Sequence, residues 1–565
     1  MARVEREPEL SSIDDIELAE ANEVSSHPTD HSQRTRAIEY KGTVATKESI
    51  PWLSLPKKDQ LFILGLCRLS EPLSNTCLLP YIYFLMKSIV VPNQDSPNED
   101  QHKQIAQLSG ILVAIFPLAQ LATSMLWARW ADKYGRRPVI VGALLVSAVS
   151  NLGFGFSRSF GSLMLWRLLA GIFNGNVGVM RTVTAEIVKE RKFQTKAFLL
   201  LPLIFNAGMV FGLAIGGWLA DPTTNMAWAF GRNGILNFSG NPDGAPFALA
   251  FPFALPAIFN FFLLTISLLM AFCGLRETLE GCEENEDTGL RFGSLIILWI
   301  RRRFSSRFAD YAAVPTNDED DRMLNQQITA MHSDAAQKKP VMQPLQPKNL
   351  WTRDVLCALI SFGILPLHNS AFMHIYPVFM STLPMDKSYQ ESKLHSHGGL
   401  GLRSSSIGLY LSFFGLCGIA LQMFVYPRFQ ARLGTLGTFR VALYMFPITY
   451  FLTPFLVLLP EQGVLRWICV GLITWSQIMA RTLAIPSTVI LLTQSAPSKS
   501  ALGRIHGAGN AGASLARAVG PALGGWILAK GIEQNMVGMV WWFYLMVVAA
   551  MALFWSFTMR NLDDS

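Results

Sequence analysis

Apolar residues along the chain gather in stretches of about 20 residues, which is the length that an α-helix needs to cross the hydrocarbon core of a bilayer. Short polar connections separate most of these stretches. The pattern predicts twelve membrane-spanning helices, over residues 59–87, 105–127, 138–157, 160–184, 197–220, 247–275, 353–381, 405–427, 436–459, 464–493, 503–529 and 536–559. We therefore expect an all-α, multi-pass membrane protein.

A long polar stretch over residues 276–352 separates the first six predicted helices from the last six. The predicted domains are thus one six-helix bundle over residues 59–275 and a second over 353–560. Residues 1–58 and 276–352 have too little apolar content to form a core. We expect them to be a disordered cytosolic tail and a cytosolic central loop.

The two halves of the chain share short segments at separations of about three hundred residues. The pairs are PLSN (72–75) with PLHN (366–369), WRLLA (166–170) with ARTLA (480–484), and GLAIGGW (212–218) with GPALGGW (520–526). A parallel repeat of this kind predicts two pseudo-symmetric bundles related by an axis along the membrane normal. It also predicts a ligand site between them, near the bilayer midplane.

Basic residues gather in connections that all fall on one side of the predicted bundles. These connections are residues 132–138, 189–196, 427–440 and 497–504. Lys and Arg concentrate in cytosolic loops, so we expect both termini to face the cytosol. The connection 221–246 falls on the other side, and its sequon Asn237-Phe238-Ser239 makes Asn237 a candidate for glycosylation.

Composition agrees with a chain embedded in a bilayer. Hydrophobic residues make up 51% of the 565 residues and charged residues 15%, with a mean hydropathy of +0.31. The net charge of +7 comes with basic residues in short connections, as membrane orientation requires, so we expect no nucleic-acid partner.

Two charged residues interrupt the first predicted helix near its middle. Arg68 and Glu71 stand three residues apart, so they share a helix face and can pair with each other. Ionisable residues inside a span are by default candidates for function. A mutual salt bridge with no further task is the alternative. Pro72 is expected to break the helix at this level.

The segment ARWADKYGRR at residues 128–137 resembles a loop signature of the major facilitator superfamily, G-x-x-x-D-[KR]-x-G-R-[RK]. The matching residues are Asp132, Lys133, Gly135, Arg136 and Arg137. Ala128 replaces the first glycine. In that family the loop is a latch that holds the cytosolic side shut in one state, so the resemblance implies a cytosolic gate. A basic loop that merely fixes the orientation is the simpler interpretation.

Arg167 in the fourth predicted helix resembles the proton-linked arginine of this superfamily. The first and fourth helices of that fold meet, so the resemblance implies that Arg68 and Arg167 compete for Glu71. Glu71 would lose its proton when an arginine approaches and regain it when desolvated. Such an exchange couples proton flow to conformational change.

A glycine-rich segment resembles the antiporter signature of drug and proton exchangers, G-x-x-x-G-P-x-x-G-G, and the signature's proline appears instead in the repeat of this segment in the other half of the chain. The residues of the segment and of its repeat are Gly208, Gly212, Gly216 and Gly217 in the fifth predicted helix, and Gly520, Pro521, Gly524 and Gly525 in the eleventh. Leu213 stands in place of the signature proline, which weakens the inference of export. In either case small residues allow helices to pack closely.

The opening of the first helix narrows the resemblance further. Residues 55–84 are similar to the zinc-induced facilitator-like branch of fungi and plants, which is near the twelve-helix drug:proton antiporters. The pattern that carries this similarity is Cys67, Arg68, Glu71 and Pro72. The plant members' Cys-Pro-Gly-Cys element is missing, so a plant-type metal role is not carried over.

The seventh predicted helix is expected to face the first across a substrate cavity. We predict that this cavity contains Asn75, Tyr81, Asn369, His374 and Tyr376. The two amides occupy matching places in the repeat, and the aromatic residues suit an amphipathic organic ligand. For His368, packing is the better interpretation.

These observations predict a proton-coupled exporter of small organic compounds that works by alternating access. The sequence has no Walker A motif, no G-x-S-x-G and no cluster of metal ligands. We thus expect no enzyme activity, no cofactor and no metal, and a proton gradient rather than ATP as the energy source. We expect a monomer in the plasma membrane rather than the vacuole. The alternatives are a facilitator for metal ions or cationic solutes, and a transporter-shaped receptor or lipid scramblase.

Overall fold

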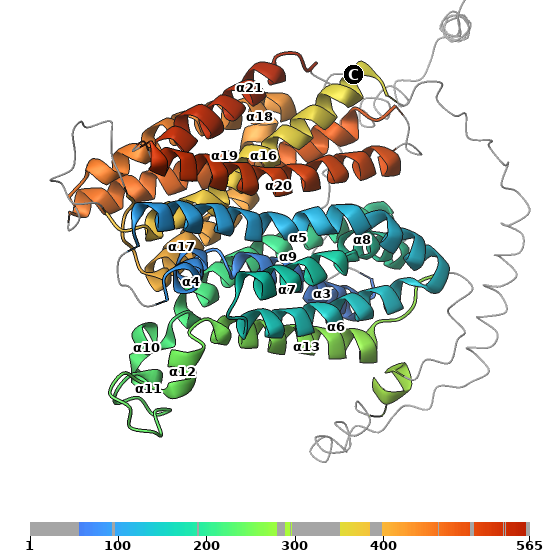
Figure 1. Cartoon of the computed structure of the whole chain (residues 1–565). Helices are drawn as coiled ribbons and strands as arrows, with labels where there is room; N and C mark the ends of the chain where they lie inside the picture. The colour runs from blue at the N-terminus through green and yellow to red at the C-terminus, as the bar shows by residue number, and fades with distance from the viewer. Residues whose placement is uncertain are drawn as a thin grey trace, which may run out of the picture. The chain divides into compact units, whose positions relative to one another are not determined.

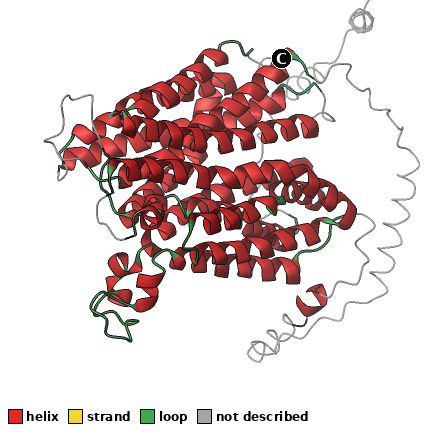
Figure 2. Cartoon of the chain, in the orientation of Figure 1, coloured by secondary structure: helices red, strands yellow, loops and turns green. Residues whose placement is uncertain are grey.

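A computed structural model of the chain describes residues 56–92, 97–188, 191–279, 289–293, 295, 351–384, 398–460, 463–497, 502–534, 536 and 538–560. Almost all of the predicted tail (1–58) and most of the predicted central loop (276–352) lie outside the described residues. Within them the chain is helical apart from loops and one bridge between Pro384 and Gly398 (Figure 2).

All twelve predicted spans correspond to helices. Among the described residues, seven helices are long and apolar enough to cross a membrane as they stand: α5 (Glu99–Tyr134), α6 (Arg136–Gly155), α13 (Ala254–Gly274), α16 (Arg353–Ser381), α17 (Ser404–Phe424), α18 (Tyr426–Leu452) continued by η4 (Thr453–Leu458), and α19 (Val464–Gln494). The other five spans are α3 (Lys58–Thr76) with α4 (Ile82–Val90), α7 (Phe160–Ile172) with α8 (Asn176–Ile187), α9 (Arg191–Leu219), α20 (Leu502–Glu533), and η6 (Val540–Met546) with α21 (Val547–Ser556).

The first span is broken, but not where the sequence predicted. Pro72 lies inside α3, and the break comes at the turn after Thr76. A proline removes its own N–H from the helix while its carbonyl still accepts, and Thr76 Oγ1 donates to that carbonyl at 2.7 Å. The turn contains Pro80, which disfavours helical backbone at the residue before it.

The fourth span is broken between α7 and α8, and side chains of α5 satisfy the carbonyls that the break leaves free. Trp127 Nε1 donates to the carbonyl of Ile172 at 2.6 Å, and Thr123 Oγ1 donates to the same oxygen at 2.8 Å. Gln120 Nε2 donates to the carbonyl of Asn174 at 3.1 Å. Irregular backbone at membrane depth requires partners of this kind.

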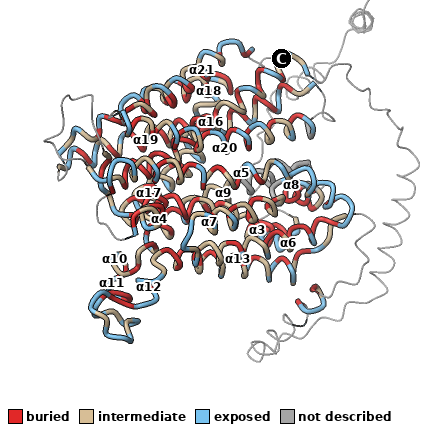
Figure 3. The backbone as a smooth tube through the Cα atoms, viewed as in Figure 1, coloured by how far each residue is buried: buried red, intermediate tan, exposed pale blue. Residues whose placement is uncertain are grey.

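The helices form two bundles, α3 to α13 and α16 to α21, which lie side by side (Figure 1). They meet mainly along two helix pairs, α5 with α20 and α9 with α17, and α16 makes smaller contacts with α4 and α5. Large apolar side chains such as those of Phe413 and Phe554 are exposed, at 63% and 71%. Exposed residues recur along the helices of both bundles (Figure 3). Exposed apolar faces of this extent are expected of helices that contact lipid.

Glycines make both seams between the bundles close, and they do so in the same way in the two repeats. A Cβ on Gly408 of α17 would lie 2.8 Å from the Cα of Gly217 of α9. In the other repeat a Cβ on Gly525 of α20 would lie 3.1 Å from the Cα of Gly110 of α5. The residue before Gly217 and the residue before Gly525 are also glycines, and these two pack within their own bundles. Gly216 packs against Cys77 at the end of α3, and Gly524 packs against α16.

We call the end of the bundles where residues 132–137 lie the basic end, and the end where residues 221–246 lie the sequon end. At the sequon end, α10 (Pro222–Asn225), α11 (Ala227–Phe230) and α12 (Pro246–Ala250) form a small lobe (Figure 1). Its core consists of Met226, Ala229, Phe230, Ala245 and Ala248. Asn237 lies on the lobe's loop, where its Nδ2 donates to the carbonyls of Arg232 and Asn241.

Candidate functional site

Arg68 and Glu71 of α3 form an ion pair, with exposed side-chain fractions of 12% and 14%. The pair is not sealed off, because both residues line a cavity inside the first bundle. We call this the bundle cavity, and its polar lining includes Arg68, Glu71, Tyr81, Ser150, Asn151 and Arg167. The structure thus brings the three residues predicted for proton coupling to one cavity.

Arg167 of α7 is buried, and it is anchored by the first helix. Its Nη1 donates to Oδ1 of Asn75 at 3.1 Å, and its guanidinium lies 5.2 Å from the ring centroid of Phe116. Its Nε has no partner among the described residues. A buried guanidinium with an unused donor beside a cavity is poised to bind an acceptor, either Glu71 or a ligand.

Two further arginines act on the same carboxylate. Arg181 of α8 and Arg517 of α20 both interact electrostatically with Glu71 and Arg68. Arg517 belongs to the second bundle, so the charge cluster reaches across the seam. The sequence interpretation missed both residues, although each is a cation inside a predicted span, and that signal was available.

Glu71 also differs from the other acids in its place along the chain. In the described helices, every other carboxylate lies within three residues of a helix end. Glu71 instead lies in the middle of the first span. Several arginines can therefore compete to pair with the ionised carboxylate of Glu71.

A second cavity opens between the bundles, at the seam of α9 and α17. We call it the seam cavity, and its lining includes Asn206, Met209, Phe372, Tyr376, Gln477 and Arg481. Asn206 Nδ2 donates to Oε1 of Gln422 at 2.8 Å, which links the bundles at the cavity wall. Tyr376 is held by Thr474, with 3.0 Å between the two hydroxyl oxygens.

The predicted substrate residues are divided between several places. Tyr81 lines the bundle cavity, Tyr376 lines the seam cavity, and Asn75 holds Arg167. Asn369 does not line the seam cavity, but it accepts from Nε2 of the lining residue Gln477 at 3.4 Å. His374 is buried and lines neither cavity.

His368 is a packing residue in this structure, as the sequence interpretation favoured. Its side chain is fully buried inside the second bundle, with Nδ1 2.8 Å from the hydroxyl oxygen of Tyr450. Its ring contacts Phe446 edge-on at 4.7 Å between centroids.

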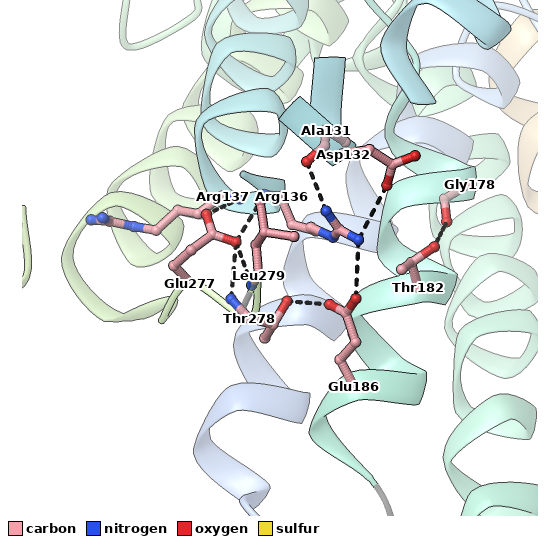
Figure 4. A network of polar contacts seen from close by, with 10 residues as sticks. All are labelled: Ala131, Asp132, Arg136, Arg137, Gly178, Thr182, Glu186, Glu277, Thr278 and Leu279. Atoms are coloured by element: carbon pink, nitrogen blue, oxygen red, sulfur yellow. Dashed lines mark hydrogen bonds and ion pairs between the residues drawn. The ribbon is translucent and has the colours of Figure 1, made fainter. Parts of the chain in front are cut away.

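Three of the predicted gate residues, Asp132, Arg136 and Arg137, belong to a polar network at the basic end (Figure 4). Arg136 donates to Asp132 at 3.1 Å and to Glu186 at 3.2 Å. Glu277 accepts from the backbone N–H groups of Arg136 and Arg137 at 2.9 and 3.0 Å, which caps the start of α6. The sequence interpretation missed both glutamates, because an acid at the end of a helix, such as Glu186 in α8, or in a loop, such as Glu277 after α13, is common and carries no signal of its own.

The tight turn of this loop depends on Gly135, whose φ is +105°. A matching turn occurs in the second repeat at Gly434, with φ +69°, inside α18. There Ala431 takes the place of Asp132. Asp132 pairs within its own bundle and its side chain is 72% exposed, and Lys133 lies over the ring of Tyr134.

Side chains that could ligate a metal do not cluster in the described part of the chain. This part contains no group of three or more His, Cys, Asp or Glu side chains that could hold a metal ion. The arginines of both cavities would also repel a cation.

Comparisons with known proteins agree with this architecture. The profile of the family described as Major Facilitator Superfamily matches residues 64–389. The chain is 32% identical to the major facilitator superfamily multidrug transporter mfsB of Aspergillus fumigatus, over 87% of this chain and 81% of that protein. It is 24% identical to the protein Zinc Induced Facilitator 1 of Arabidopsis thaliana, over 83% of each chain. The crystal structure of a D-xylose-proton symporter aligns with a TM-score of 0.54 at 11% identity, over 90% of this chain and 99% of that one.

Proposed function

Since the chain belongs to the Major Facilitator Superfamily of membrane transporters, we propose that it is a proton-coupled exporter of small organic compounds such as drugs, toxins or secondary metabolites. It is a multi-pass membrane protein that transports small molecules and is not an enzyme. Export agrees with its likeness to a multidrug transporter. The orientation proposed is the one predicted from the basic loops, with both termini in the cytosol of a plasma-membrane protein.

One observation carries the proton coupling: Glu71 is an acid in the middle of a span, it lines a cavity, and it is paired with Arg68. An ionised carboxylate at this depth is costly unless cations compensate it. Movement of Arg517 with the second bundle changes that compensation, because its guanidinium interacts with Glu71 across the seam. Opening the seam between α5 and α20 would therefore remove one of the cations that compensate the ionised carboxylate.

Alternating access requires the two ends to close in turn. The glycine contacts of α9 with α17 and of α5 with α20 support closure of the sequon end. Asn225 Nδ2 also donates to Ser404 Oγ at 3.2 Å across the same seam. At the basic end Asp132 pairs with Arg136 of its own bundle and stays exposed. This supports a state in which the predicted gate does not hold the two bundles together at that end. The arrangement supports a state open toward the basic end.

The test uses the full chain reconstituted in liposomes with an acidic interior. Fluorescent probes of opposite charge, carboxyfluorescein and rhodamine 123, are added outside, and a trapped pH dye reports the interior. An antiporter moves a probe inward as protons leave. In Glu71→Gln we expect the gradient-driven accumulation and the associated proton movement to be lost. Asp243→Asn removes an exposed acid of the sequon-end lobe and serves as the matched control.

The alternatives give different results. A receptor or a lipid scramblase would move neither probe under the gradient in the wild type. A scramblase would in addition move a fluorescent lipid across the bilayer. Probe and proton movements that are equal in Glu71→Gln and in the wild type would refute coupling through this residue. Size-exclusion profiles and thermal unfolding show whether each variant is folded.

A further inference from the structure

Arg481 projects from α19 into the seam cavity, between the two bundles. Its Nη2 lies 3.1 Å from the sulfur of Met209 on α9, and its Nη1 lies 3.9 Å from the sulfur of Met373 on α16. The residue therefore touches both bundles at once. In the sequence repeat it is the counterpart of Arg167.

The guanidinium of Arg481 has no acidic partner among the described residues. It carries five N–H donors, and thioether sulfur is a weak acceptor. A cation this far inside a span is costly unless a counter-charge or water compensates it. The guanidinium of Arg167 donates to the amide oxygen of Asn75, whereas the acceptors around Arg481 are the two methionine sulfurs.

The rest of the interior has the same imbalance of charge. Arg68, Arg167, Arg181, Arg481 and Arg517 all lie within described helices of the predicted spans, and Glu71 is the carboxylate in those helices that lies away from a helix end. Glu71 pairs with Arg68 and interacts electrostatically with Arg181 and Arg517. No acid lines the seam cavity within the described residues. A confined space with cationic walls concentrates anions and excludes cations.

The remaining lining of the seam cavity suits the body of an organic molecule. Leu213, Phe372 and Ile478 offer apolar surface, while the amides of Asn206 and Gln477 supply a few polar contacts. A mostly apolar cavity with a small number of placed polar groups is typical of sites for small organic ligands.

We propose that the seam cavity binds organic anions, and that Arg481 receives the carboxylate or sulfonate group of the substrate. The proposal rests on the proposed transport function and names its substrate class. A carboxylate matches the planar fork of a guanidinium and would replace the two methionine sulfurs. Because Arg481 contacts α9 as well as its own bundle, an anion bound to it would lie between the two bundles and could contact both.

The experiment measures equilibrium binding to the full chain in nanodiscs, without any gradient. Three probes share one shape and differ in charge: 1-naphthoate, neutral 1-naphthamide and cationic 1-naphthylmethylammonium. We expect naphthoate to bind most tightly. Arg481→Gln should weaken naphthoate binding about tenfold or more, the effect of losing a charge-assisted hydrogen bond, and should leave naphthamide binding unchanged. Arg481→Lys should retain part of the preference. Arg403→Gln, at the exposed start of α17, is the matched control.

Two results would overturn the proposal. The first is wild-type protein that binds naphthoate no better than its neutral and cationic analogues. The second is a naphthoate preference that survives Arg481→Gln in folded protein. Failure of the transport function has a different signature, because naphthoate would then bind through Arg481 and yet not accumulate under a proton gradient in liposomes.

Discussion

Asn206 of α9 and Gln422 of α17 form a hydrogen bond of 2.8 Å that joins the two bundles at the wall of the seam cavity. In the proposed alternating-access cycle, the helices that carry these two amides move relative to each other. The contact therefore belongs to one state of the transport cycle.

The first prediction concerns this bond. A double-mutant cycle of Asn206→Ala and Gln422→Ala, read by thermal unfolding in detergent, should give a coupling of about 0.5–1.5 kcal/mol, the net value of one hydrogen bond. Gln477 lines the same cavity but bonds to Asn369, so the cycle of Asn206→Ala with Gln477→Ala should be additive. Additivity in the first cycle would show that the amides do not interact.

The second prediction concerns the glycine seam of α9 and α17. In Gly408→Val the added side chain meets the backbone of Gly217, which forces the bundles apart at the sequon end. We expect a fall of about tenfold or more in the initial rate of probe transport in liposomes, the effect of about 1–3 kcal/mol of steric strain. Gly512 has open space around it and supplies the control variant Gly512→Val. Normal transport by Gly408→Val would mean that this seam does not need to close.

The third prediction concerns the cap of α6. Glu277→Ala leaves the N–H groups of Arg136 and Arg137 without their acceptor, and the start of α6 loses a favourable negative charge. Unfolding free energy should fall by about 1–2 kcal/mol, seen as a lower midpoint of thermal unfolding. Asp100→Ala removes an exposed acid from the first turn of α5 and is expected to cost less. Equal midpoints for Glu277→Ala and the wild type would contradict the capping role.

The fourth prediction concerns an ion cluster at the sequon end. Glu533, the last residue of α20 and beyond the predicted span, pairs with Lys103 of α5 at 3.1 Å and with Lys530 at 2.9 Å. Hydrogen bonds from Lys530 and Lys103 hold the pKa of Glu533 below its ordinary value of 4.5. The stabilisation from this cluster is thus fully present above that ordinary value and is lost as the pH falls through the lowered pKa.

Glu533 should consequently stay ionised throughout the neutral and mildly acidic range. The pH dependence of probe transport in that range should be the same in Glu533→Gln as in the wild type. A pH profile that shifts in this variant would assign part of the proton dependence to the sequon end instead of to Glu71.

The sequence predicted the spans well, because the length of an apolar stretch is a direct consequence of bilayer thickness. It also predicted the glycine repeats. It could not tell that Gly216 packs within a bundle while Gly217 crosses between bundles, since that depends on how α9 is rotated. We predicted the break at Pro72, whereas it lies after Thr76. A proline is tolerated inside a helix when neighbouring side chains satisfy the backbone groups around it, as Thr76 does for the carbonyl of Pro72.

The candidate site was predictable in part. Arg68, Glu71 and Arg167 were recognisable as charges inside spans, and the structure places them at one cavity. Arg517 and Arg481 were recognisable in the same way, as cations inside predicted spans, but the residues that they meet across the seams depend on how the two bundles pack. For the same reason His374 was assigned to a cavity that it does not line.

The central claim is that Glu71 carries the proton that drives transport. The most direct measurement compares gradient-driven accumulation with substrate-for-substrate exchange in liposomes that contain Glu71→Gln, using the probe that the wild type accumulates. We predict that exchange persists, because the neutral amide mimics the protonated carrier, while accumulation against a gradient is abolished. Accumulation that still follows the proton gradient in Glu71→Gln would contradict the account.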